Sequence, residues 1–204
     1  MHVYILLDRS GSMESLWDEA LSSINTYVRD LAADTKVTLA VFDDYAGVNY
    51  IKLRDKVKSQ AWPQVTRTEV APRGGTPLFD AAGKMLNEMI ENDHRKAIFV
   101  CMTDGFENAS KEFNKAQITA KVEQAKKNDW GIVFLGADFS KVGDSAGAIG
   151  ISTGSTVNWR KGMFDVGTQY LNVKTASYAA AAEGQGYATM DSWTDEEKAK
   201  VEGK

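Results

Sequence analysis

The sequence is poor in the features that mark several large classes of protein. Its 204 residues include a single cysteine, so an internal disulfide is excluded, and this usage agrees with a reducing compartment. Three prolines, and no internal repeat or linker-like stretch, argue against a division into several domains. The longest apolar runs, Ala97–Met102 and Gly131–Ala137, are far too short to cross a membrane as a helix. We therefore expect one domain with its own core and no membrane span.

The sequence also lacks a large excess of charge of either sign. The chain carries 24 Lys and Arg residues against 28 Asp and Glu, a formal net charge of −4. This balance gives no general attraction to nucleic acid or to an anionic membrane, so we expect neither as a partner. The apolar opening Val3–Leu7 has no basic lead-in and ends at Asp8, which makes it too short for a signal peptide. These features predict a cytoplasmic chain.

Short apolar runs alternate with helical patterns along most of the chain. Wholly apolar strands between helices are typical of a mostly parallel sheet covered on both faces, with right-handed crossovers. The segment Val48–Leu53 alternates in polarity and follows a short turn, so we expect an antiparallel edge strand there. The patterns predict strands at 3–7, 37–42, 48–53, 97–102, 132–135 and 149–153, and helices at 14–33, 77–89, 114–128, 140–147 and 162–182.

We expect the domain to cover residues 1–182 and a C-terminal tail to cover residues 183–204. The tail is polar and rich in small residues, and Thr194 with Glu197 forms a capping-box pattern that predicts a short terminal helix. The tail is expected either to pack on the same domain or to fray from it.

The fragment Asp8-Arg9-Ser10-Gly11-Ser12 follows the first predicted strand and is the most informative part of the sequence. It lies at the carboxyl edge of the sheet, where open α/β sheets bind their ligands. Residues two apart in extended backbone point the same way, so Asp8, Ser10 and Ser12 converge, with Gly11 allowing the chain to bend. One carboxylate and two hydroxyls are hard oxygen donors that suit Mg²⁺, Mn²⁺ or Ca²⁺. The alternative is a helix start, with Ser10 or Ser12 as the N-cap.

Two further loops bring similar chemistry to the sheet. The fragment 74–77 (Gly-Gly-Thr-Pro) precedes a predicted helix, and the fragment 103–105 (Thr-Asp-Gly) follows the strand at 97–102. Asp104 therefore adds a second carboxylate at the carboxyl edge. The alternatives are structural: an ordinary turn at Asp104, and an N-cap at Thr76 with Pro77 as the first helical residue.

Together the three loops resemble the metal-ion-dependent adhesion site (MIDAS) of the von Willebrand factor A (VWA) domain family. The family pattern is Asp-x-Ser-x-Ser after the first strand, a Thr in a second loop and an Asp in a third. The matching positions here are Asp8, Ser10, Ser12, Thr76 and Asp104. The segments Phe99–Gly105 and Gly131–Ala137 also resemble the family's fourth and fifth strands, so the likeness covers residues 2–180.

The resemblance implies a Rossmann-like three-layer α/β/α sandwich. Its six-stranded, mostly parallel sheet is expected to have the order 3-2-1-4-5-6 with strand 3 antiparallel, which agrees with the hairpin expected at Val48–Leu53. Among family members the chain is most similar to small stand-alone proteins of bacteria and phages, because it shows no secretion signal and no flanking domain.

The resemblance also implies a Mg²⁺ ion, or Mn²⁺ or Ca²⁺, held by Asp8, Ser10, Ser12, Thr76 and Asp104. Mg²⁺ takes six oxygens and these residues offer at most five, so at least one position stays open. An Asp or Glu of an unknown protein partner is expected to fill it, which predicts a cation-dependent docking or adaptor domain and not an enzyme. The partner-facing rim is expected to include Arg9, Arg73, Glu107 and Asn108.

Two other functions stay open. One is a Mg²⁺-dependent phosphoryl-transfer enzyme or phosphatase with Asp8 at its site, although Ser10 stands where such phosphatases have a second carboxylate. The other is a structural or assembly protein whose metal only stabilises the fold. A serine nucleophile is disfavoured, because His2 and His94 are expected at the amino edge of the sheet, far from the serines. Cys101 lies in a predicted strand and is expected to be a core thiol.

Overall fold

The computed structural model describes residues 1–137, 146–147 and 149–204 of the chain. Within these residues the sheet consists of β1 (His2–Asp8), β2 (Lys36–Asp43), β3 (Asn49–Lys58), β4 (Ala97–Thr103), β5 (Gly131–Ala137) and β6 (Thr156–Trp159). Their order across the sheet is β3-β2-β1-β4-β5-β6. Strand β3 pairs antiparallel with β2, and every other neighbouring pair is parallel. The predicted strand order and the antiparallel third strand are confirmed.

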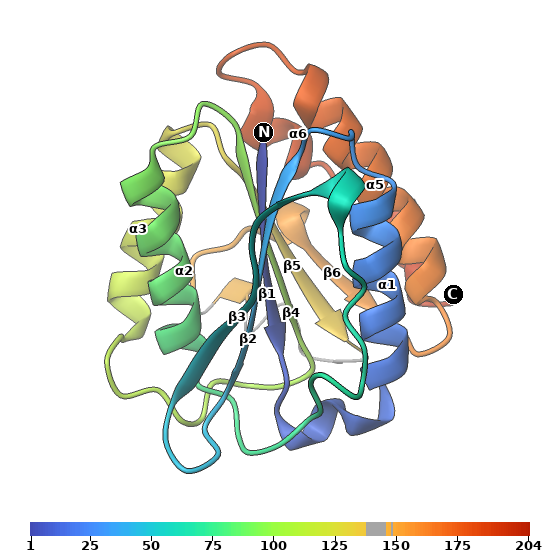
Figure 1. Ribbon diagram of the computed structural model, residues 1–204. Helices are drawn as coiled ribbons and strands as arrows, with labels where there is room; N and C mark the ends of the chain where they lie inside the picture. The colour runs from blue at the N-terminus through green and yellow to red at the C-terminus, as the bar shows by residue number, and fades with distance from the viewer. Residues whose placement is uncertain (138–145, 148) are drawn as a thin grey trace.

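Helices cover both faces of the sheet, which completes the three predicted layers (Figure 1). One face carries α1 (Trp17–Arg29) and α5 (Phe164–Ala180), and the other carries α2 (Leu78–Asn92) and α3 (Lys115–Lys127). Successive side chains of a strand point to opposite faces, so Ile5 and Leu7 of β1 pack toward α1, while Tyr4 and Leu6 pack toward α2. Every residue of β1, β4 and β5 is buried, because both faces are covered.

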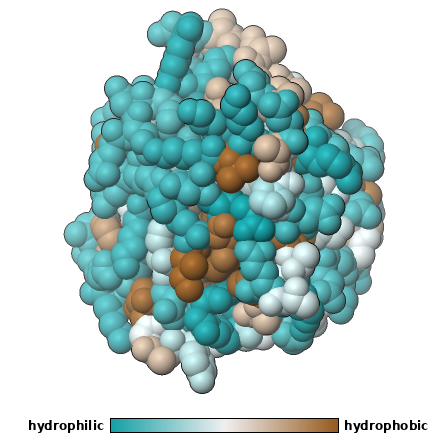
Figure 2. Space-filling view, viewed as in Figure 1, coloured by the Kyte–Doolittle hydropathy of each residue, from teal (hydrophilic) through white to brown (hydrophobic). Residues whose placement is uncertain are grey.

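Strand β3 forms one edge of the sheet, and its side chains are half-buried or exposed throughout. It runs on to Lys58, beyond the predicted end at Leu53, with an irregular register near Lys56, whose φ is +54°. Figure 2 shows the same side of the molecule as Figure 1: its surface is largely hydrophilic, with a small hydrophobic patch near the centre. The partial exposure of the β3 side chains agrees with the alternation of polar and apolar residues at Val48–Leu53.

The register brings the carboxyl ends of three strands level with one another. Asp8 at the end of β1 lies opposite Phe42 of β2, and Leu7 lies opposite Met102 of β4. Strand β1 lies between β2 and β4, so the chain leaves β1 at the point where the strand order reverses. The loops that follow β1 and β4 therefore diverge from one place at this edge, as ligand-binding loops of open α/β sheets do.

The predicted position of the last strand is wrong. It was expected at 149–153, but β6 begins at Thr156, and the chain before it turns at Gly150, whose φ is +78°. The apolar side chains of Ile149 and Ile151 are buried on the α2–α3 face of the sheet. Their pattern therefore reflects packing of a turn into the core and not a strand.

Most of the predicted helices are present, but some of them begin or end at other residues than predicted. The helix expected at 14–33 is divided into the 3₁₀ turn η1 (Gly11–Ser15) and α1, which ends at Arg29. The helices expected at 114–128 and 162–182 are α3 and α5. The helix expected at 140–147 falls mainly outside the described residues. In the described part of the chain, no helix is both long and apolar enough to span a membrane.

The tail contains two short helices, α6 (Gly186–Met190) and α7 (Asp195–Val201). Thr194 Oγ1 accepts a hydrogen bond from the Glu197 N–H, and the Glu197 carboxylate accepts one from the Thr194 N–H, so the predicted capping box is present. The buried apolar side chains of the tail belong to the core on the α1–α5 face: Met190, Trp193 and Val201. The tail therefore packs on the domain.

Replacing Trp193 by alanine should destabilise the whole domain, because this side chain is 4 % exposed and the ammonium group of Lys174 in α5 lies over its ring. We expect the free energy of unfolding to fall by about 3 kcal/mol, a typical cost of truncating a buried tryptophan. Urea denaturation followed by circular dichroism measures the change. The matched control is Val173→Ala, at an exposed position of α5. A loss below about 0.5 kcal/mol for Trp193→Ala would show that the tail is not docked in solution.

Candidate metal centre

The site begins with a buried carboxylate at the end of the central strand. Asp8 is fully buried, and its two carboxylate oxygens accept hydrogen bonds from the Ser10 N–H at 2.7 Å and the Thr103 hydroxyl at 2.6 Å. Thr103, the last residue of β4, was not predicted as part of the site. In the sequence, Thr103 is marked only by its position next to Asp104, and the fragment 103–105 could equally be an ordinary turn.

The serines of the first loop connect Asp8 to the loop after β4. Ser10 Oγ lies 3.1 Å from Ser12 Oγ, and the Ser12 hydroxyl donates to Asp104 Oδ1 at 2.8 Å. Ser10 occupies the N-cap position of η1, but its side chain makes no capping hydrogen bond. The alternative explanation of these serines as helix caps therefore holds for the position of Ser10 but not for its side chain, since the Ser10 hydroxyl lies beside Ser12 and the Ser12 hydroxyl donates to a carboxylate.

Thr76 reaches the same place from the loop before α2. Pro77 is the N-cap residue of α2, so the prediction of Thr76 as the cap and Pro77 as the first helical residue is wrong by one position. A methyl group added at Gly105 would lie 3.4 Å from Thr76 Oγ1 and 4.0 Å from Ser12 Oγ. The two hydroxyls therefore flank one point beside Gly105. The structure thus gathers all five predicted ligand residues at the carboxyl edge of the sheet.

Backbone contacts hold the second loop against the first. The Arg73 N–H donates to the Arg9 carbonyl at 2.7 Å, and the Gly11 N–H donates to the Gly74 carbonyl at 2.9 Å. Gly74 has φ +67°, and a Cβ there would lie 2.7 Å from the backbone nitrogen of Tyr45. A larger residue at 74 would push the second loop away from the β2–β3 turn, so glycine is required at this position.

Two of the predicted rim residues hold the third loop in place. Glu107 Oε2 accepts a hydrogen bond from the Phe79 N–H in the first turn of α2 at 2.8 Å, and Oε1 accepts one from Ser110 N–H at 2.7 Å. Asn108 is exposed, yet its Oδ1 accepts from the Thr76 N–H at 2.9 Å and its own N–H donates to the Thr76 carbonyl at 3.1 Å. Glu107 is half-buried and both of its carboxylate oxygens accept hydrogen bonds within the protein, so it supplies an acceptor to the start of α2, a role that the sequence did not predict.

The two arginines of the predicted rim differ in position. Arg9 is 7 % exposed and its guanidinium forms an ion pair with the fully buried Asp43, so its predicted place on the rim is wrong. Arg73 Nε lies 3.3 Å from Asp43 Oδ1, its side chain is 40 % exposed, and its guanidinium carbon lies 5.2 Å from the centre of the Tyr45 ring. A carboxylate as buried as that of Asp43 requires such partners, because an unpaired buried charge is strongly unfavourable.

The donor set suits a hard divalent cation. Burial raises the pKa of Asp8 to about 7, although hydrogen bonds from Thr103 and Ser10 oppose the shift, and burial also raises the pKa of Asp104. The ionised form of both carboxyls is thus short of compensating positive charge, which a cation would supply. The described part of the chain contains no group of three or more His, Cys, Asp or Glu side chains arranged so that they could hold a metal ion. Two carboxylates and three hydroxyls are ligands for Mg²⁺, Mn²⁺ or Ca²⁺.

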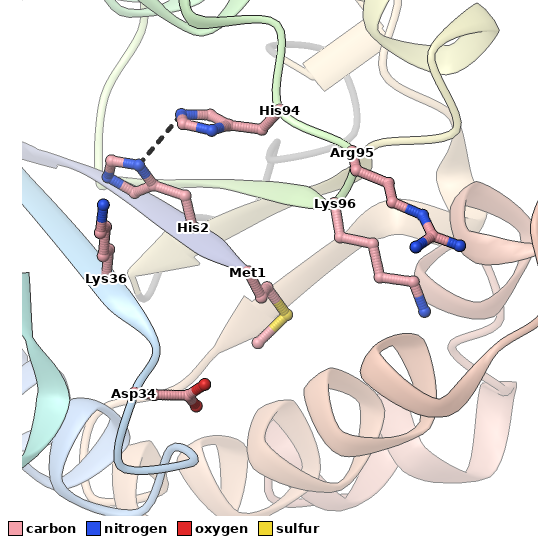
Figure 3. A pocket seen from close by; sticks show the side chains of 7 residues that line it. All are labelled: Met1, His2, Asp34, Lys36, His94, Arg95 and Lys96. Carbon is pink, nitrogen blue, oxygen red and sulfur yellow. Dashed lines mark hydrogen bonds between the residues drawn. The ribbon is translucent and has the colours of Figure 1, made fainter.

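The two histidines lie together at the opposite edge of the sheet. His2 Nδ1 lies 3.1 Å from His94 Nε2, and the Tyr4 hydroxyl lies 2.8 Å from the same nitrogen of His94. Both rings line an open pocket of about 500 Å³ at the start of β1 (Figure 3). His2 begins β1 and His94 precedes β4, so both lie at the opposite end of the strands from Ser10 and Ser12, as predicted. Cys101 is fully buried in β4, and burial raises the pKa of its thiol, as expected for a core residue.

The decisive comparison concerns the sequence of residues 2–165, which matches the model of the von Willebrand factor type A domain. The chain belongs to the VWA family. Domains of this family are typically interaction modules, and solved VWA structures share the fold of this chain. No curated protein sequence matches it.

Three solved structures illustrate the likeness. The vWF domain of the type V pili tip protein Mfa5 from Porphyromonas gingivalis is 12 % identical, with a TM-score of 0.62, over 84 % of this chain and 95 % of that one. Manganese-loaded TRAP protein from Plasmodium vivax is 15 % identical, with a TM-score of 0.60, over 84 % and 71 %. Proximal thread matrix protein 1 from the mussel byssus, with a zinc-occupied MIDAS motif, is 13 % identical, with a TM-score of 0.59, over 84 % and 45 %. This VWA chain therefore spans less than half the length of some proteins that share its fold.

The buried Asp8 carboxyl should make the metal-free protein sensitive to pH. A carboxyl whose pKa is higher in the folded than in the unfolded chain stabilises the fold while protonated, and this stabilisation disappears as the pH rises through about 7. In EDTA we expect the free energy of unfolding of the wild type to fall between about pH 4 and pH 7, by roughly 2–4 kcal/mol more than that of Asp8→Asn. Urea unfolding at a series of pH values tests this, and parallel profiles for the two proteins would contradict it.

Proposed function

We propose that this VWA chain is a divalent-cation-dependent docking domain that binds a protein partner through an acidic side chain. The observation that carries the proposal is the convergence of three loops at the carboxyl edge of the sheet. Asp8 and Asp104 are buried or half-buried carboxylates without an ion pair to a basic side chain of the described residues. The hydroxyls of Ser10, Ser12 and Thr76 lie in the loops between them.

The number of oxygen ligands favours a cation that contacts a partner over a cation fully enclosed by this protein. Mg²⁺ prefers six oxygens in octahedral geometry, and the five side chains supply five at most. Only two of the five are charged, so a bound cation would keep its attraction for a further anion and an open position on the exposed side. A carboxylate from another protein is a hard oxygen anion that could fill this position.

Solved structures of similar proteins support cation binding by this chain, but they do not identify its partner. TRAP was solved with manganese, and proximal thread matrix protein 1 with zinc in its MIDAS motif. We infer that this chain binds Mg²⁺, or Mn²⁺ or Ca²⁺, with the ligands given above. The chain shows no basic excess that would favour nucleic acid or a membrane, and we propose that it acts in the cytoplasm.

Removing one metal-coordinating side chain should remove most of the stabilisation that the cation gives to the fold. In wild type, Mg²⁺ at about 100 times its dissociation constant should add roughly 2.7 kcal/mol to the free energy of unfolding, a rise in Tm of roughly 5–10 °C. Thr76→Ala should lose most of this rise, whereas the exposed Thr68→Ala should retain it. Thermal melts in EDTA and in Mg²⁺ give both values. Equal rises in wild type and Thr76→Ala would contradict the assigned ligands.

Partner binding should depend on the same ion. Immobilised wild-type protein is expected to retain specific proteins from a cell lysate in Mg²⁺ and to release them in EDTA. Asp104→Asn should retain none of them, and its melting curve in EDTA should stay cooperative. Proteins that remain bound in EDTA would contradict a cation-mediated contact.

The same preparations distinguish the two alternatives. A phosphoryl-transfer enzyme should hydrolyse p-nitrophenyl phosphate in Mg²⁺ and lose this activity in Asp8→Asn. A domain whose metal only stabilises the fold should show the rise in Tm but no cation-dependent capture. The docking proposal requires the rise in Tm and the capture together, without hydrolysis above a buffer blank.

A further inference from the structure

Two aromatic side chains are exposed on loops beside the metal centre. The described residues include only four large hydrophobic side chains with high exposure: Tyr45, Ile51, Phe106 and Val173. Tyr45, in the β2–β3 turn, is 60 % exposed, and Phe106, directly after the Asp104-Gly105 fragment, is 46 % exposed. We refer to Tyr45 and Phe106 as the aromatic rim. Their exposure beside an open cation site marks an interaction surface, because soluble domains normally bury such rings.

The Tyr45 side of the aromatic rim is held rigidly. The Tyr45 N–H donates to Asp43 Oδ1 at 2.8 Å, and Gly74 packs so closely against this nitrogen that a Cβ would not fit. The guanidinium of Arg73 lies over the ring at 5.2 Å and is itself tied to Asp43. The carboxylate of Asp44, the other charged group of this turn, accepts a hydrogen bond from the Gly75 N–H. A ring positioned in this way loses little conformational freedom when a partner covers it.

The Phe106 side is anchored to the same second loop. Gly105 lies against the Thr76 hydroxyl, and Asn108 binds both backbone groups of Thr76. Glu107 fixes the following residues to the start of α2. Phe106 is therefore carried by a loop whose residues on both sides are fixed relative to a cation ligand, and its distance from the centre is set by the fold.

We propose that the partner of this domain presents a carboxylate directly beside a large apolar or aromatic side chain. The inference rests on the proposed function: the carboxylate completes the coordination of the cation, while the neighbouring side chain packs on the aromatic rim. Apolar packing around the contact excludes water and strengthens the bond between the carboxylate and the cation. The half-exposed guanidinium of Arg73 adds a positive charge that favours an acidic segment over a basic one.

Three capped peptides test the proposal: acetyl-Leu-Glu-Phe-amide, acetyl-Ser-Glu-Ser-amide and acetyl-Leu-Gln-Phe-amide. Each is titrated to millimolar concentration into ¹⁵N-labelled protein in Mg²⁺ and in EDTA, and the dissociation constant is read from amide shift changes. We expect Leu-Glu-Phe to bind about tenfold more tightly than Ser-Glu-Ser in Mg²⁺, as burial of part of an apolar side chain predicts. Leu-Gln-Phe should not bind in either buffer, and neither glutamyl peptide should bind in EDTA.

Variants separate the aromatic rim from the cation site. Tyr45→Ser and Phe106→Ser should reduce the affinity for Leu-Glu-Phe to that for Ser-Glu-Ser, while their rise in Tm with Mg²⁺ stays as in wild type. Val173→Ser, at an exposed position of α5, is the matched control and should keep the preference. Equal affinity of wild type for both glutamyl peptides would overturn this inference and leave cation docking intact. Binding of neither glutamyl peptide in Mg²⁺ would overturn the proposed function itself.

Discussion

The rest of the site depends on one constraint, the burial of the Asp8 carboxylate at the end of the central strand. Strand β1 has neighbours on both sides and helices on both faces, so its last residue has no access to solvent. The carboxylate is satisfied by the Ser10 N–H and the Thr103 hydroxyl, one from its own loop and one from β4. These two bonds draw the first and third loops together. Burial leaves the negative charge of the ionised carboxyl incompletely compensated, which raises the pKa of Asp8.

The loops around this carboxylate are held both by one another and by residues at the ends of β2 and α2. Asp43 pairs with Arg9 of the first loop and contacts Arg73 of the second. The second and third loops are joined by Asn108, which binds both backbone groups of Thr76. Each of these contacts satisfies a backbone or charged group that would otherwise be buried without a partner. The loops that carry the Ser10, Ser12 and Thr76 hydroxyls are therefore held in place by contacts within the protein.

The two edges of the sheet have separate chemistry. The carboxyl edge carries oxygen donors on loops, whereas the amino edge carries the histidine pair and its open pocket (Figure 3). Burial and the nearby lysines Lys56 and Lys36 lower the pKa of both histidines. Both rings lie within hydrogen-bond distance of neighbouring side chains, among them Thr38 and Tyr4.

Apolar runs, turn residues and alternating polarity were enough to predict the alternation of strands and helices, the antiparallel edge strand, and a carboxylate after each of two strands, Asp8 and Asp104. The strand order and the full set of Asp8, Ser10, Ser12, Thr76 and Asp104 were predicted from the resemblance of three loops to the VWA family, and the structure has that strand order. The tertiary structure alone decided which polar residues face inward. Arg9 and Glu107 look like rim residues in sequence, but a carboxylate from β2 binds the first and the start of α2 requires the second. Burial and hydrogen-bond partners of such residues come from segments distant in the chain, so no local pattern encodes them.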